Sequence, residues 1–192
     1  MTTIIDGTAG VTFPAGGVGN PASAVVGLTD TQTLTNKSVV ATQLTGTIAA
    51  ARLPTGSVLQ VVQTINSTTF SSSSTSYVTP TNMSVTITPT SATSKILVLM
   101  RVMCSGSLAG TITLRGQLIR GATALDSGDS GATPAYSFIN TRFVNYLDSP
   151  ATTSATTYSY QFYGDGATWY VNQTGSSGNP ASSQLTLMEI AA

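Results

Sequence analysis

The chain has 192 residues, of which 41% are hydrophobic and only 7% are charged, and its seven basic and seven acidic residues balance. Without net charge it has no field to attract nucleic acid or an anionic membrane surface, so neither is an expected partner. Low charge with abundant Ser, Thr and Gly favours β structure with many turns over highly charged disorder.

No apolar run approaches the roughly 20 residues that a membrane helix needs. The leading MTTIIDGTAG lacks the basic and apolar regions of a secretory signal, so we expect a protein made and assembled in a cytosol. The single cysteine, Cys104, excludes an intrachain disulfide and ends an apolar run, which predicts a small buried side chain.

Residues 1–43 have small apolar groups, a Gly- and Pro-punctuated stretch and no helical stripe. Such a segment has too few apolar residues for a core of its own. We expect an extended arm that orders by docking onto other chains, with a disordered tail as the alternative.

Residues 44–56 predict a short helical junction. Thr47 can cap a helix through Ile48–Arg52, Pro54 ends it, and Gly56 turns the chain. So short a helix is marginal alone in water, so we expect it to pack against copies of itself. The residues predicted to clamp the copies together are Ile48, Ala49, Ala51, Arg52 and Leu53.

Residues 57–192 predict an all-β head domain. Asn82–Thr88 alternates strictly, with Met83, Val85 and Ile87 on one face. Lys95–Cys104 is apolar on both faces, as in a strand buried between two layers, although a buried helix is an alternative.

Further strands are expected within Gly110–Arg120, Tyr136–Leu147, Thr156–Tyr163 and Ser183–Ile190. Ser127–Pro134 has the composition of a loop. Gly164-Asp165-Gly166 predicts a hairpin that joins Thr156–Tyr163 to Ala167–Asn172. Eight or nine strands separated by turn signals predict an antiparallel, jelly-roll-like β-sandwich.

Four segments carry a resemblance to a known family. Asp30–Lys37 (DTQTLTNK) and Gly46-Thr47-Ile48 with Arg52-Leu53-Pro54 resemble the arm-and-collar region of tailed-bacteriophage fibre proteins. Tyr146–Gln161 and the closing SQLTLMEIAA are similar to parts of the distal β domains of that family. The resemblance implies a trimer with a proximal anchor on a baseplate or other virion protein and a β-rich head.

Enzyme chemistry has little support in the sequence. The absence of histidine excludes Ser-His-Asp and Cys-His catalysis and His-ligated zinc. Asp126 and Asp129 are close in sequence but lie in a Gly- and Ser-rich stretch that predicts a solvated turn rather than a glycosidase pair or a calcium loop. We therefore expect no enzyme, no metal and no cofactor.

Binding is the remaining chemical possibility. Tyr163 and Tyr170 flank a turn with Asp165, and aromatic faces beside a carboxylate could bind a host-surface glycan. The alternative is that strand alternation sends Trp169 and Val171 into the core and leaves only Tyr170 outside.

The sequence and this resemblance together predict a non-enzymatic virion structural protein, a short tail fibre that attaches by its arm and presents a trimeric head to the host. A capsid head fibre or decoration protein has the same architecture and stays open as an alternative. A bacterial surface lectin or adhesin is less favoured because an export signal is missing.

Overall fold

The fold is given by a computed structural model that describes residues 4–6, 10–12, 48–49, 52–107, 112–133, 140–174 and 180–192. The chain divides into two compact units, Met1–Thr47 and Ile48–Ala192. In the first unit, strands β1 (Ile4–Asp6) and β2 (Gly10–Thr12) pair antiparallel. The remainder of the predicted arm, with its DTQTLTNK motif, lies outside the described residues.

The second unit is all-β in its described residues, as the sequence predicts. Its strands are β3 (Val58–Asn66), β4 (Phe70–Ser72), β5 (Ser84–Ile87), β6 (Lys95–Gly106), β7 (Ile112–Arg120), β8 (Thr123–Thr133), β9 (Asn140–Asp148), β10 (Thr156–Gly164), β11 (Trp169–Val171) and β12 (Ser183–Ile190).

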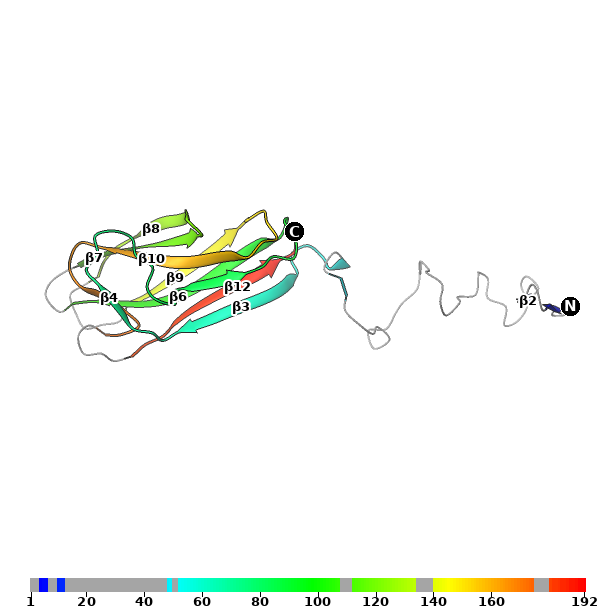
Figure 1. The fold of residues 1–192 in the computed structure, drawn as a ribbon, viewed down its shortest axis with the longest axis horizontal. Helices are drawn as coiled ribbons and strands as arrows, with labels where there is room; N and C mark the ends of the chain where they lie inside the picture. Colours follow the sequence, from blue (N-terminus) through cyan, green and yellow to red (C-terminus); the bar gives the residue numbers. More distant parts are fainter. Residues whose placement is uncertain are drawn as a thin grey trace. The chain divides into compact units, whose positions relative to one another are not determined.

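Two antiparallel sheets form a sandwich. One has the strand order β5-β10-β7-β8. In the other, β12 lies between β3 and β6, while β9 and the short β11 both pair with β6 and β4 pairs with β11 (Figure 1). The eight principal strands are thus divided four and four between the sheets, with the chain crossing repeatedly from one sheet to the other. This is the arrangement of a jelly roll, so the predicted fold class is confirmed.

The core lies between the sheets and comes from one face of each strand. The predicted alternation of β5 is confirmed, because Met83, Val85 and Ile87 are all buried. Further buried side chains come from β6 (Ile96, Val98, Met100, Val102, Cys104), β10 (Tyr158, Tyr160, Phe162) and β12 (Leu185, Leu187). Period-two burial of apolar side chains therefore sets the register of these strands.

Two local predictions in the head are wrong. Ser127–Pro134 was expected to be a loop, but β8 continues to Thr133 because its backbone pairs with β7, and pairing outweighs weak strand propensity. Ala167–Asn172 was expected to form a hairpin with Thr156–Tyr163. Instead, β11 pairs with β6 and β4, so the Asp165 turn carries the chain from one sheet to the other.

The junction differs from the predicted helix. Among its described residues, the Arg52 amide donates to the Ala49 carbonyl at 2.9 Å, which closes a single 3₁₀-type turn. Pro54 ends the turn, and residues 44–47, 50 and 51 of the predicted junction lie outside the described residues. The predicted turn at Gly56 is confirmed: Gly56 has φ +89°, and the Ser57 amide donates to the Pro54 carbonyl at 3.1 Å.

The chain enters and leaves the jelly roll at the same end (Figure 1). There the Gly56 amide donates to the Ala191 carbonyl at 2.8 Å, and the Ala191 amide donates to the Ser57 carbonyl at 2.9 Å. Along β6, Lys95 pairs with Ile190 at this end, whereas Gly106 pairs with Trp169 at the opposite end. We call these the junction end and the distal end of the head.

Candidate functional site

The predicted receptor-binding residues all lie near the distal end. Tyr163, on the outer face of β10, packs against Tyr77 with 5.6 Å between ring centroids, and the Arg115 guanidinium lies 5.7 Å from its ring centre. Tyr170 projects from the outer face of β11, which belongs to the other sheet. The two tyrosines therefore lie on outer faces of different sheets, and their role in binding stays a prediction.

Asp165 caps the turn between these strands. Its Oδ2 accepts the Thr113 amide at 2.7 Å, and its Oδ1 accepts the Ala167 amide at 3.3 Å. These hydrogen bonds, the one from Thr113 first, hold the pKa of the Asp165 carboxyl below its usual value. The residue is exposed and stays ionised, which leaves its remaining lone pairs facing solvent.

Trp169 belongs to the core, as strand alternation predicts. It is 0% exposed, and its ring packs between Phe70 and Phe162, with centroid distances of 5.6 and 5.4 Å. Val171 is also fully buried, while Tyr170 between them is half-buried. Trp169 is therefore unavailable to a ligand and stabilises the distal end.

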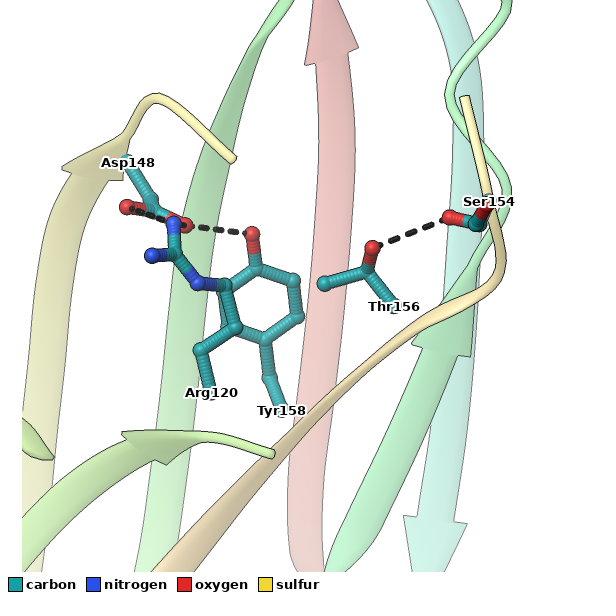
Figure 2. Close-up of polar contacts among 5 residues, drawn as sticks. All are labelled: Arg120, Asp148, Ser154, Thr156 and Tyr158. Atoms are coloured by element: carbon teal, nitrogen blue, oxygen red, sulfur yellow. Dashed lines mark hydrogen bonds and ion pairs between the residues drawn. The ribbon is translucent and has the colours of Figure 1, made fainter. Parts of the chain in front are cut away.

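A buried polar cluster links the two sheets (Figure 2). Arg120 Nη1 of β7 donates to both Asp148 carboxylate oxygens, at 2.9 and 2.7 Å, and the Tyr158 hydroxyl of β10 donates to Asp148 Oδ2 at 2.7 Å. Asp148 ends β9, which lies in the opposite sheet. Burial, reinforced by the Asp148 carboxylate, raises the pKa of the Tyr158 hydroxyl far above its usual value of 10.0. The cluster therefore holds the two sheets together at this point.

A second buried carboxylate lies at the junction end. Glu189 of β12 is 0% exposed. It accepts hydrogen bonds from Gln60 Nε2 at 2.6 Å, from the Thr90 amide at 2.8 Å and from the Thr90 hydroxyl at 2.7 Å. Burial acts to raise the pKa of Glu189, but these hydrogen bonds outweigh it and hold the pKa below the usual 4.5.

This shift predicts acid sensitivity. The folded state holds the pKa of Glu189 below 4.5. The ionised carboxylate therefore contributes its full stabilisation of the fold above about pH 4.5, and this stabilisation is lost as the pH falls through the folded-state pKa. We expect Glu189→Gln to lower the free energy of unfolding by about 1–3 kcal/mol at pH 7. Melting temperatures measured at a series of pH values should converge for the two proteins in acid; a constant gap would contradict this assignment.

The outer face of the larger sheet carries most of the exposed large apolar side chains in the described part of the head. It comes from β3, β12, β6 and β9, and we call it the apolar face. Its apolar members are Val58, Val61, Ile65, Leu97, Leu99, Met103, Phe143, Leu147, Met188 and Ile190. A surface hollow of about 350 Å³ between Leu99, Arg101, Phe143 and Gln184 lies within it.

No metal-binding cluster emerges from the described residues. Nowhere among them do three His, Cys, Asp or Glu side chains gather as a metal site would require. In the same part of the chain, no helix is long and apolar enough to cross a membrane. Of the residues predicted to clamp copies together, Ile48 is 54% exposed and Arg52 is also exposed, so both are accessible to a partner.

Sequence reasoning missed both carboxylate clusters. Arg120 and Asp148 are 28 residues apart, and Gln60 and Glu189 are 129 apart, so no local spacing signals either contact. The apolar face did leave a signal, since β9 alternates Phe143 and Leu147 with Val144 and Tyr146 and is thus apolar on both sides.

Comparison with known protein families and with curated proteins gives no match to this sequence. Among solved structures, a chain from the T13 particle of infectious bursal disease virus is 13% identical, with a TM-score of 0.39, covering 69% of this chain and 36% of the viral one. Chains from the Gx and Gt strains of that virus are 11% and 14% identical, with TM-scores of 0.38 and 0.41.

The Gx comparison covers 69% of this chain and 37% of the viral chain, and the Gt comparison covers 95% and 47%. This chain thus spans between a third and a half of the length of the viral chains. Its assignment as a jelly roll rests on its own strand order, which is independent of these likenesses.

Proposed function

We propose that this chain is a structural protein of a tailed-bacteriophage particle, a short tail fibre whose jelly-roll head contacts the host surface. The observation that carries the proposal is that the two ends of the head differ. The chain enters and leaves at the junction end, whereas Tyr163, Asp165 and Tyr170 lie near the distal end. A head held at one end presents the other end outward.

The division of the chain into two compact units also supports a fibre with an attachment segment and a separate head. The boundary between the two compact units, at Thr47/Ile48, falls inside the Gly46–Pro54 segment that resembles the collar of phage fibres. A separate leading unit suits attachment to a baseplate or other virion protein, and copies of the chain would meet at Ile48–Leu53 as a homotrimer. Jelly rolls occur in both viral capsid and lectin domains, so this head is compatible with a virion role and with glycan binding.

Deleting residues 57–192 tests the proposal. Particles should retain the remaining stub and lose adsorption to the host, because the head and its distal end are gone. Within the intact head, Asp165→Ala combined with Tyr163→Ala should weaken adsorption. Thr153→Ala, an exposed position in the loop between Asp148 and Thr156 at the junction end, is the matched control and should leave adsorption unchanged. Undiminished adsorption after removal of the head would refute the host-binding role.

A further inference from the structure

The apolar face exposes large side chains to an unusual degree. Phe143 is 77% exposed, Ile65 59%, Val61 53% and Leu147 53%. On the opposite face of the same strands, Val62, Val144 and Tyr146 are half-buried and pack against the core, so the exposed side chains belong to the solvent side of the sheet.

Strand register makes this surface continuous. Val61 of β3 pairs with Met188 of β12, Met188 pairs with Leu97 of β6, and Leu97 pairs with Leu147 of β9. One unbroken apolar row therefore crosses all four strands. Side chains directly opposite each other on adjacent strands are in contact, so the row is a single surface rather than scattered residues.

Few charges interrupt the face. Its charged members among the described residues are Lys95 and Arg101. Arg101 Nη2 donates to the Ser182 carbonyl at 3.3 Å, while its Nε is buried and has no hydrogen-bond partner. Two separated cations are too few to attract a nucleic acid, whose binding needs a basic patch or stripe. The face is therefore almost free of charge and suits an apolar partner.

The sequence of β6 matches a strand covered on both sides. Ile96, Val98 and Val102 are covered by the other sheet, whereas no second layer of described residues covers Leu97 and Leu99, which are only half-buried. Strands that are apolar on both faces normally lie between two layers. A layer that covers Leu97 and Leu99 therefore has to come from outside the head.

The area of the face suits an interface between proteins. Four strands about 4.8 Å apart and about eight residues long give a flat footprint of roughly 500 Å², and projecting side chains raise the accessible area further. This approaches the roughly 800 Å² that each partner contributes to a standard interface. It is also at the upper end of the roughly 300–600 Å² of the largest patch on a typical monomer.

We propose that the apolar face is where copies of this chain pack against one another. The chain has no net charge, so copies do not repel each other. Asn145 and Gln184 lie on the same face as uncharged polar side chains, so they add no repulsion between copies. This inference rests on the homo-oligomer of the proposed function and deepens it by placing the main contact on the head rather than at Ile48–Leu53.

Two substitutions on the full-length chain test the proposal. In Phe143→Glu/Leu147→Glu, two exposed side chains become carboxylates. Arg101 lies directly opposite position 143 in the monomer, so the charge there has a partner and the fold is preserved. Thr86→Glu places a carboxylate at an exposed strand position on the other sheet and is the matched control. Light-scattering mass after size exclusion gives the oligomeric state, and circular dichroism verifies folding.

The wild-type chain and Thr86→Glu should have masses that are the same multiple of 19.6 kDa, whereas the double variant should be a folded monomer. A wild-type monomer at all concentrations would overturn the proposal, and so would a double variant that keeps the wild-type mass. If the double variant does not fold, the single Leu147→Glu change decides by the same criterion. The adsorption experiment is separate. If removal of the head abolishes adsorption while Phe143→Glu/Leu147→Glu keeps the wild-type mass, the tail-fibre role stands and only this interface is rejected.

Discussion

Replacing Trp169 with alanine should lower the free energy of unfolding by about 3–5 kcal/mol, the range for removing a large aromatic side chain from a core. The indole is 0% exposed and packs against Phe70 and Phe162, which belong to different sheets. Its removal leaves a cavity at the distal end that this closely packed core cannot fill. Urea unfolding followed by far-ultraviolet circular dichroism gives the loss directly.

Tyr170→Ala is the matched control for this prediction. It removes an aromatic side chain from the adjacent position of β11, but one that is half-buried on the outer face. We expect a clearly smaller loss of stability. Equal losses for Trp169→Ala and Tyr170→Ala would show that burial of Trp169 does not determine the stability of the distal end.

Replacing Asp148 with alanine should lower the free energy of unfolding by about 2–3 kcal/mol, because it removes a charged acceptor from the buried Tyr158 hydroxyl and from the partly buried Arg120. The change leaves the Arg120 guanidinium and the Tyr158 hydroxyl without their acceptor. Asp148 is 6% exposed, and its partners lie in the opposite sheet, so the loss weakens contact between the sheets. Thermal and urea unfolding of the variant measure the effect.

A double-mutant cycle with Tyr158→Phe separates the hydrogen bond from packing. Tyr158→Phe alone should cost about 1–3 kcal/mol, since it takes one donor from a buried carboxylate. It should cost much less in the Asp148→Ala background, because the bond is already gone. Additive losses would mean that the 2.7 Å contact between Tyr158 and Asp148 does not stabilise the fold.

The sequence predicts the jelly roll well where apolar alternation dominates. In β5, β10 and β12 the buried apolar side chains all fall at alternate positions, because the core selects the face of each strand. β8 is different, since its Gly- and Ser-rich sequence has weak strand propensity and forms a strand only through pairing with β7. Such tertiary pairing leaves no local signal.

Turn chemistry explains the other errors. The Asp165-Gly166 turn is predicted from sequence and is present, but a turn signal does not specify which sheet receives the next strand. At the junction, the alanines predict a helix by propensity, yet the run before Pro54 is too short to extend beyond one turn. Of the candidate site, the residue types near Asp165 could be predicted, while the placement of Tyr163 and Tyr170 on different sheets could not.

Imaging a labelled chain on virus particles is the most direct test of the proposed role. A tag added after Ala192, which is exposed at the junction end, can be located by electron microscopy of purified particles. A tail fibre predicts label at the tail, with a trimeric head projecting from it. Label over the capsid would identify a head fibre or decoration protein instead, and particles that carry no label at all would contradict a virion role.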